Sequence, residues 1–353
     1  MNLEGLLLRN TVEFSSKDSV VGYESGFIEY LDDKITKLGY DTEITDSGLL
    51  VVKSEDENYS NHYTSAHVDR SSLVIQDGKL TYSVHAIKDR EEVEIRPTES
   101  FCDKIGKRFV DKEVRIGDEV HKVSSYEIVR NENGHNRLEF FLEGDVDVSN
   151  YDDQGVSYAK PITISEDKQF LEGQLDNVLS VGALYTLLEE GKVKGNVIFS
   201  IGEEVGLSGD KIVDYLHSKG IDKTDELLIL DTTPFEEDDY RPEELILRNR
   251  DTRGEFNRDR NKLLESILTE NQIPYRFKDK IQEEKGLVQY NESGEVKKGY
   301  GKTELGKIVQ LTNGDINGIT LQLPNTGDGI EERTSIEGFA KFYGVLGEYY
   351  NRI

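Results

Sequence analysis

The stretch Val197-Ile-Phe-Ser-Ile-Gly-Glu-Glu-Val-Gly-Leu-Ser-Gly209 decides how the rest of the chain is organised. Val197 to Ile201 is a short, mostly apolar run rich in β-branched side chains, which predicts a buried strand of a parallel sheet. Glu203 and Glu204 follow at its carboxyl end, where open α/β sheets bind ligands. Because neighbouring residues of an extended chain point to opposite sides, one glutamate can face a metal ion while the other faces a water molecule. A solvent-exposed acidic turn is the alternative.

A second predicted strand, Tyr63-Thr-Ser-Ala-His-Val-Asp69, ends in a histidine and an aspartate. In a strand, His67 and Asp69 lie on one face. A metal-binding imidazole usually donates its other N–H to an acceptor, often a carboxylate, so we expect His67 as a ligand and Asp69 as its orienting partner. A surface histidine beside an aspartate is the alternative. The remaining five histidines have no comparable setting, and we assign them ordinary polar roles: His62, His85, His121, His135 and His217.

Two more carboxylates occupy similar positions. Asp176 precedes an apolar helix that is predicted to run to Leu188, and its two oxygens could bridge two cations; its alternative role is a helix N-cap. Asp231 ends the apolar run Glu226–Leu230, and its alternative role is a turn before Thr232-Thr-Pro234. Together with His67 and the glutamate pair, these positions predict a metal site at the carboxyl edge of the sheet.

Composition narrows the class of protein. The chain has 353 residues, and 70 acidic against 43 basic side chains give a formal net charge of −27. This charge argues against binding to nucleic acid or to anionic membrane surfaces, which require a basic face. The single cysteine, Cys102, excludes an internal disulfide framework and a cysteine-based metal cluster. The start does not resemble a signal peptide and no apolar run reaches membrane-spanning length, so we expect a soluble cytoplasmic protein.

The middle of the chain differs in character from its two ends. Predicted strands separated by turn residues recur between residues 71 and 166, which indicates a small inserted β-rich barrel or sandwich. These strands are Leu80–Ile87, Glu92–Ile95, Glu113–Arg115, His121–Val129 and Arg137–Leu142. We expect residues 1–70 and 167–353 to form one α/β domain with a mixed central sheet flanked by helices. Its predicted elements include helices over 21–38, 257–271 and 336–350, a hairpin over 42–52, and late strands over 308–311 and 319–323.

The order and approximate spacing of these motifs resemble the co-catalytic di-zinc aminopeptidases, most closely the glutamyl aminopeptidase and tetrahedral (TET) aminopeptidase family. The matching motifs are His67-x-Asp69, Leu175-Asp176-Asn177, Glu203-Glu204-Val-Gly-Leu-Ser-Gly209 and Asp231. The Glu-Glu-Val-Gly-Leu-x-Gly string is the most specific of them. The β-rich insertion is similar to the second domain of that family, and the resemblance extends over nearly the whole chain.

This resemblance implies a role for each residue. His67 and Asp231 would bind one metal ion, Glu204 would bind the other, and Asp176 would bridge them. Asp69 would orient His67. The implied cofactors are two divalent ions, and ligands without thiolates suit zinc, with cobalt or manganese as alternatives.

The resemblance also implies an activity. Glu203 would act as the general base toward a metal-bridging water, taking its proton and passing it to the leaving amine. The expected substrates are peptides, which would lose residues from the N-terminus. The family resemblance further implies a homo-oligomer.

The chain departs from the family pattern at the second metal position. No histidine follows His217, so the usual last histidine ligand is missing. Asp328 falls in its place if one residue is deleted, and Glu332 then matches a family glutamate. Asp328 could ligate and would favour a harder metal, or it could be a turn residue that leaves the second site weak or empty. Two other departures are Arg70, where the family has an acidic residue, and Thr303-Glu304, where it has Thr-Asp.

Three functions are therefore compared. The first is a metal-dependent aminopeptidase. The second is a deacylase or carboxypeptidase-like hydrolase on the same metal core. The third, suggested by Asp328, is a degenerate, non-catalytic metal-binding or assembly protein.

Overall fold

The computed structural model describes residues 3–91, 96–131, 134–144, 146–291 and 296–353. The strands of its main sheet are β1 (Thr42–Ile44), β2 (Leu50–Val52), β3 (Tyr63–His67), β10 (Thr163–Ile164), β11 (Phe170–Gly173), β12 (Asn196–Ser200), β13 (Thr224–Pro234), β14 (Leu245–Leu247), β15 (Tyr275–Phe277), β18 (Ile316–Gly327) and β19 (Glu332–Ser335). Six others are β4 (Leu73–Gln76), β5 (Lys79–Tyr82), β6 (Glu113–Ile116), β7 (Glu119–Arg130), β8 (Asn136–Leu142) and β9 (Gln154–Tyr158), and a small hairpin pairs β16 (Gln289–Tyr290) with β17 (Val296–Lys298). The helices are α1 (Leu3–Ser15), α2 (Ser25–Lys37), α3 (Ser83–Arg90), α4 (Glu99–Phe109), α5 (Val178–Glu189), α6 (Ser208–Ser218), α7 (Arg258–Glu270), α8 (Lys278–Glu284), α9 (Glu304–Leu311) and α10 (Ile336–Arg352).

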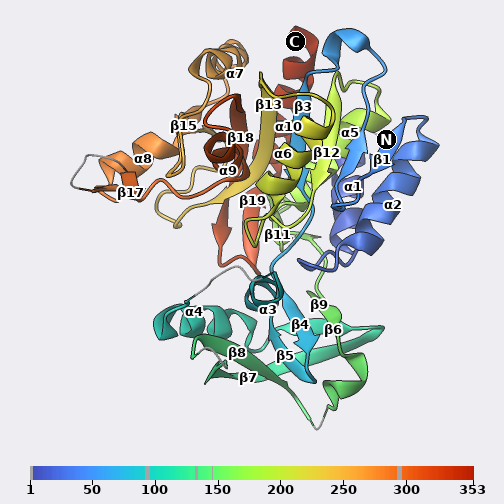
Figure 1. Cartoon of the computed structure of the whole chain (residues 1–353), viewed down its shortest axis with the longest axis vertical. Helices are drawn as coiled ribbons and strands as arrows, with labels where there is room; N and C mark the ends of the chain where they lie inside the picture. The colour runs from blue at the N-terminus through green and yellow to red at the C-terminus, as the bar shows by residue number, and fades with distance from the viewer. Residues whose placement is uncertain (1–2, 92–95, 132–133, 145, 292–295) are drawn as a thin grey trace.

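The main sheet is mixed and is flanked by helices. Within the described residues it has eleven strands, ordered β1-β2-β12-β3-β13-β18-β19-β11-β10, with β14 pairing β15 and β18. A separate closed barrel, β4-β5-β8-β7-β6-β9, lies below this sheet (Figure 1). The chain enters the barrel after β3 and returns through β10 and β11. The predicted fold class, a mixed α/β sheet with an inserted β-rich module, is confirmed.

Strand β12 shows why the opening stretch organises the fold. Val197 and Phe199 point into the core that contains buried side chains of α1, α2, α5 and α10, whereas Ile198 points into the core that contains those of α6 and α9. Every residue of β12 is buried. Burial on both faces explains the apolar run and its β-branched residues, because strands covered on both sides lack polar alternation. β12 pairs in parallel with β3 and antiparallel with β2.

The barrel has a core of its own, closed on one side by helix α4. Cys102, Ile105 and Phe109 recur at helical spacing and are buried among the barrel side chains. The hydroxyl of Thr98 caps this helix by accepting a hydrogen bond from the Phe101 N–H at 3.2 Å. The sequence patterns had predicted no helix in this segment.

Two predicted strands are wrong. The run Leu80–Ile87 is a strand only to Tyr82, because helix α3 begins at Ser83. The run Ile308–Leu311 belongs to helix α9, whose N-cap Thr303 accepts a hydrogen bond from the Gly306 N–H at 3.0 Å. In both runs an apolar spacing compatible with a strand also fits a helix, so local periodicity did not discriminate. The predicted strand Glu92–Ile95 lies outside the described residues.

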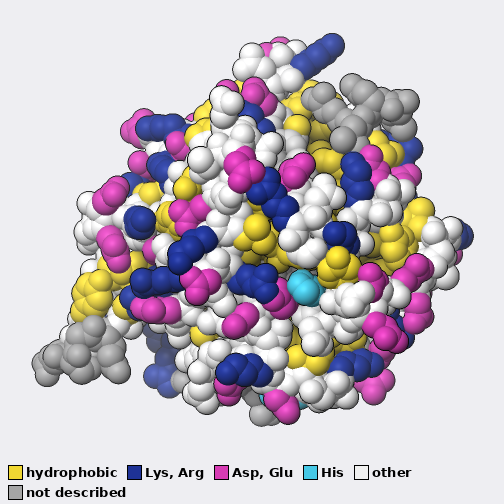
Figure 2. All heavy atoms as spheres, turned by 90° about the horizontal axis from the view of Figure 1, so that it is seen from above, with side chains coloured by type: hydrophobic (Ala, Val, Ile, Leu, Met, Phe, Trp, Pro, Cys, Tyr) yellow, Lys and Arg dark blue, Asp and Glu magenta, His cyan; other side chains and the backbone are white. Residues whose placement is uncertain are grey.

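Acidic and basic side chains are interspersed on the face of the molecule opposite the barrel (Figure 2). Exposed charges in such a mixture help to keep a protein from aggregating and contribute little to its stability. Within the part of the chain that the structure describes, no helix combines the length and the apolar character that a bilayer crossing requires.

Candidate metal centre

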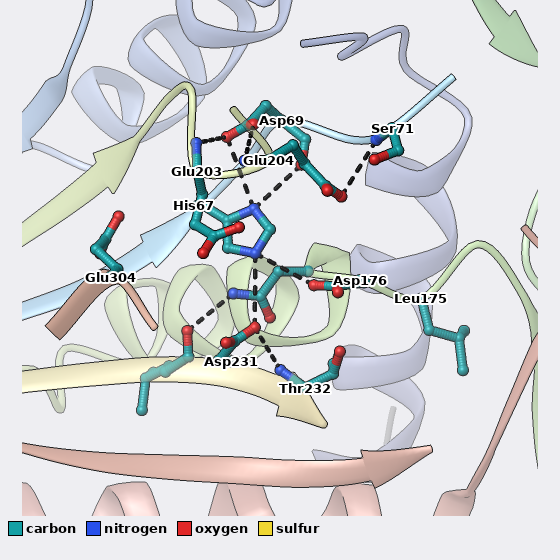
Figure 3. A network of polar contacts seen from close by, with 12 residues as sticks. His67, Asp69, Ser71, Leu175, Asp176, Glu203, Glu204, Asp231, Thr232 and Glu304 are labelled. Atoms are coloured by element: carbon teal, nitrogen blue, oxygen red, sulfur yellow. Dashed lines mark hydrogen bonds and ion pairs between the residues drawn. The ribbon is translucent and has the colours of Figure 1, made fainter. Parts of the chain in front are cut away.

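Three neighbouring parallel strands bring the predicted residues to one edge of the main sheet (Figure 3). β12 pairs with β3 so that Ser200 lies opposite His67, and the Glu203–Glu204 pair follows β12 directly. On the other side, β13 pairs with β3 up to the residue before Asp231. Asp176 comes from the short connection between β11 and α5. The carboxyl ends of these strands therefore form the predicted ligand-binding edge.

His67, Asp176 and Asp231 converge on one point. His67 Nε2 lies 3.2 Å from Asp176 Oδ1 and 3.5 Å from Asp231 Oδ1. One potential ligand atom from each residue lies within 4.8 Å of the other two. Asp176 Oδ1 is buried and, among the residues that the structure describes, has no hydrogen-bond partner of good geometry, although it faces the imidazole. A buried carboxylate oxygen without a donor is what a bound cation would satisfy, and the mixed nitrogen and oxygen donor set fits zinc and similar metals.

Asp69 orients His67 through its main chain. The Nδ1 of His67 lies 3.1 Å from the carbonyl oxygen of Asp69, and a carbonyl can only accept, so Nδ1 is the donor. In the neutral ring, Nε2 then carries the lone pair on the side of the two carboxylates. The Asp69 side chain is 3.7 Å from Nδ1 and accepts the main-chain N–H groups of Glu203 and Glu204 at 3.1 and 3.0 Å. Asp69 thus links the two predicted motifs.

The glutamate pair occupies a tight turn. Gly202 has a φ of +82°, in the left-handed region that favours glycine, and it turns the chain away from β12. The Glu204 carboxylate accepts the Ser71 N–H at 3.3 Å. Among the described residues, no hydrogen bond or ion pair involves the Glu203 carboxylate.

The electrostatics of this edge match a cation site. Burial, and then the charge of Asp176, raises the pKa of Glu204 to about 7. Burial, together with Asp231 and Glu204, raises the pKa of Glu203 well above its usual range, against the opposing effect of His67. For His67, burial acts to lower the pKa, but the contacts with Asp176 and Asp231 and the charges of Asp176 and Glu203 outweigh it and raise the pKa. Uncompensated negative charge of this kind would be relieved by a divalent ion.

A cavity of about 690 Å³ opens beside these carboxylates. Asp176, Glu204, Asp328 and Glu332 line one part of it. Barrel helix α4 and helix α8 supply other parts of the wall, with Phe101, Lys104, Ile105, Arg108, Phe109, Lys278 and Ile281. The inserted barrel therefore helps to enclose the candidate site.

Asp328 lies in this cavity wall and also makes a turn. Its Oδ1 accepts the N–H groups of Ile330 and Glu331, both at 2.9 Å, in the connection between β18 and β19. The three-residue cluster of potential ligand atoms found among the described residues does not include it. The turn role is thus observed, and its role as a ligand stays a prediction.

Glu332 accepts hydrogen bonds from the backbone that carries Asp176. Its Oε2 accepts the N–H groups of Leu175 and Asp176 at 2.7 and 3.0 Å, and its Oε1 accepts from Asn325 Nδ2 at 2.7 Å. Burial, and then repulsion from Asp176, raises the pKa of Glu332 to about 8. Its match to a family glutamate was the sequence feature that pointed to it, although it was not predicted to act in the site.

Glu304 and Arg70, the other two departures from the family pattern, have separate structural roles. Glu304 is buried and accepts the hydroxyls of Ser65 at 2.8 Å and Ser200 at 2.7 Å, on the two strands that lead to His67 and Glu203. Arg70 points away from the cluster. Its guanidinium donates to Ser19 Oγ at 2.8 Å and to the carbonyls of Ser15 and Lys17 after helix α1.

Comparison with known proteins gives a family match and fold matches. Residues 144–287 match the family model of the M42 glutamyl aminopeptidases. Among curated proteins no significant match was found. The TET aminopeptidase of a marine sediment archaeon of the Thaumarchaeota is 11% identical, with a TM-score of 0.70 over 98% of this chain and 96% of that one. An aminopeptidase of Desulfurococcus kamchatkensis is 13% identical, with a TM-score of 0.70 over 100% and 96%. The Pyrococcus horikoshii TET1 peptidase, which can assemble into a tetrahedron or a large octahedral shell, is 14% identical, with a TM-score of 0.65 over 98% and 99%.

These matches agree with the motif-based resemblance. The segment that matches the family model contains Asp176, Glu203, Glu204 and Asp231. The predicted resemblance to the glutamyl aminopeptidase and TET family is confirmed, and with it the prediction of a metallo-aminopeptidase type of hydrolase. Because the matched structures share so little sequence with this chain, they support its fold alone.

Proposed function

We propose, on the premise of the M42 family match, that this chain is a metal-dependent aminopeptidase that removes residues from the N-terminus of peptides. The single observation that carries the proposal is the convergence of His67, Asp176 and Asp231 within 4.8 Å, next to a glutamate pair and a cavity. Buried acidic groups with strongly raised pKa values beside a cleft are typical of functional sites.

The proposed ligands follow from this geometry and from the family resemblance. His67 and Asp231 would hold one divalent ion, Glu204 and Asp328 the second, and Asp176 both. When bound, such ions polarise a peptide carbonyl and make a water molecule acidic enough to attack it at neutral pH. Zinc is the proposed metal, and cobalt or manganese would also fit the donor set.

Glu203 is the proposed general base. Its carboxylate is not engaged by any described hydrogen bond, and it lies one residue from Glu204 in a turn fixed by Asp69. In the proposed reaction Glu203 takes a proton from the attacking water and delivers it to the leaving amine. Asp69 positions both Glu203 and His67 and does not contact the substrate.

The cavity supports a peptide substrate with a free amine. Its volume of about 690 Å³ accommodates a few residues. Acidic and basic side chains both line it, and the exposed carboxylates of Glu236 and Glu237 could pair with an ammonium group.

Assembly and location are also proposed. The TET1 peptidase of Pyrococcus horikoshii can assemble into a tetrahedron or a large octahedral shell, and we propose a homo-oligomer here, which the molar mass in solution would test. We propose the cytoplasm as the location, in keeping with the single cysteine. Cell fractionation would test it.

The proposed function is tested by replacing Glu203. We expect Glu203→Gln to lower peptidase activity by about 10²–10⁴-fold without loss of metal, because the amide cannot accept the proton. Glu57→Gln, at an exposed position in the short 3₁₀ helix Glu57–Tyr59, is the matched control and should leave activity unchanged. Full activity in the Glu203→Gln protein would falsify the proposal.

The two alternatives give different outcomes with the same protein. A deacylase or carboxypeptidase-like hydrolase would release product from peptides with a blocked N-terminus, whereas an aminopeptidase needs the free amine. The non-catalytic alternative is favoured only by the turn role of Asp328. It predicts sub-stoichiometric metal and no hydrolysis of either kind of peptide.

A further inference from the structure

A buried chain of polar side chains reaches Asp231 from the side opposite His67. Arg248 Nε donates to Gln322 Oε1 at 2.7 Å, and Gln322 Nε2 donates to Asp231 Oδ2 at 3.3 Å. Gln322 is directly opposite Asp231 in the register of β13 and β18, and opposite Ile246 in that of β14 and β18. Three adjacent strands therefore fix the order Arg248, Gln322, Asp231.

The direction of these hydrogen bonds is determined by the arginine. A guanidinium has only donors, so the atom of Gln322 that faces Arg248 must be the carbonyl oxygen. The amide nitrogen then faces Asp231 Oδ2, with a second, longer contact of 3.5 Å to the Thr232 carbonyl. The other oxygen, Asp231 Oδ1, accepts the Thr232 N–H at 2.7 Å and lies on the side of His67.

Arg248 is itself held in place. Its exposed fraction is 6%, that of Gln322 is 1%, and Arg248 Nη1 donates to the Tyr300 carbonyl at 2.7 Å. Burial lowers the pKa of Arg248, while Asp251, Asp231 and Asp279 act against this. A guanidinium stays charged under these conditions, so a fixed positive charge lies behind the acidic cluster.

We propose that Gln322 and Arg248 are positioning residues of the metal centre, which fix the Asp231 carboxylate so that Oδ1 points to His67. The inference rests on the proposed function, because it needs Asp231 to be a ligand. Outer partners of this kind set the orientation of a ligating side chain, and their loss typically weakens metal binding by about 10–100-fold.

The test is zinc affinity, measured by competition with a chromophoric chelator on metal-free protein. Gln322→Glu keeps an acceptor for Arg248 but removes the N–H donated to Asp231, and we expect it to weaken zinc binding by about 10–100-fold. Arg248→Lys loses the fork geometry and should weaken it in the same direction. Thr320→Val is the matched control, since Thr320 lies two residues before Gln322 on the same strand face and its buried hydroxyl has no hydrogen-bond partner within the described part of the chain.

A second readout separates positioning from general damage. With cobalt in place of zinc, the visible absorption spectrum reports the ligand geometry, and we expect it to change in Gln322→Glu and to stay unchanged in Thr320→Val. Thermal unfolding identifies any variant that fails to fold. If either Gln322→Glu or Arg248→Lys does not fold, the zinc affinity of the other variant decides the test. If wild-type protein binds zinc and the folded variants bind it equally, with an unchanged cobalt spectrum, the inference is overturned. A wild-type protein that binds no zinc would overturn the proposed function as well.

Discussion

His67 at the edge of the main sheet and His85 in helix α3, beside the barrel, are both buried, with exposed fractions of 3% and 0%. Their surroundings are opposite. Around His67, one ring nitrogen donates to a carbonyl and the other faces two carboxylates, and the pKa is raised. His85 has no hydrogen-bond partner at either ring nitrogen among the described residues, and burial, and then Arg137, lowers its pKa to about 4.

The difference shows what distinguishes a ligand histidine from a core histidine. Burial is common to both, so burial by itself indicates no function. What differs is the convergence of acceptors, which only the sheet edge provides. His85 instead packs its ring edge-to-face on Tyr82, with centroids 5.0 Å apart.

We expect the largest effect on zinc affinity when the imidazole at the sheet edge is removed. Replacing a direct ligand should cost more than replacing an outer partner, so we expect His67→Ala to weaken zinc binding by more than about 100-fold. His85→Leu is the matched variant from the barrel and should bind zinc as the wild type does. Competition with a chelator measures both. The comparison fails if the two variants lose zinc affinity equally.

The second prediction concerns the barrel histidine and pH. The unfolded chain takes up a proton on this ring near pH 6.5, whereas the folded protein does so only near pH 4. The unfolded state therefore binds more protons between these values, and the stabilising contribution present above pH 6.5 is lost as the pH falls. We expect the wild type to lose about 1–3 kcal/mol relative to His85→Leu between pH 6.5 and pH 4.

This prediction is measured by denaturant unfolding of both proteins across that pH range. Comparing the two proteins cancels the titration of the other groups. A stability difference that does not change with pH would mean that His85 is hydrated or paired in the folded protein.

We expect the smallest effect, on the binding of a second zinc ion, when a new histidine is placed among the carboxylates. Asp328→His returns an imidazole to the cavity wall near Asp176 and Glu204, and we expect a second zinc ion to bind about 10-fold more tightly than in the wild type. Asp328→Asn keeps an oxygen for the Ile330 and Glu331 N–H groups and serves as the control. Elemental analysis after dialysis against zinc counts the ions per chain.

The starting point for that comparison is the wild type. Two tightly held ions per chain would mean that Asp328 or a neighbour already completes the second site. One ion would mean that the missing histidine is a real loss, and none would favour the non-catalytic alternative. An Asp328→His protein with no gain over Asp328→Asn would place the defect elsewhere in the cavity wall.

The strand-end residues were predictable because each follows an apolar run. His67, Asp231 and the glutamate pair could be located from the sequence, and parallel strands bring such ends together without further information. The exact contacts were not predictable. The Asp69 side chain was expected at His67, but the local turn directs it to the backbone of Glu203 and Glu204 and leaves its carbonyl for the imidazole.

The outer partners could not be read from local patterns. Gln322 lies on β18, and Arg248 directly follows β14, far away in sequence. Their meeting depends on strand order and register, which a single sequence does not specify. Helix α4 was detectable in principle, from the Thr98 cap and the spacing of Cys102, Ile105 and Phe109. It was missed because predicted strands surround it.

The insertion of the whole barrel between β3 and β11 has a consequence for biosynthesis. The ribosome completes the strand of His67 early, then the barrel, and only afterwards the segments with Asp176 and Asp231. His67, the first of the proposed ligands, is made 109 residues before Asp176 and 164 residues before Asp231, so the contacts within the cluster are long-range in sequence. A nascent chain therefore lacks the complete cluster until Asp231 has been synthesised, and we expect the proposed activity to be absent up to that point.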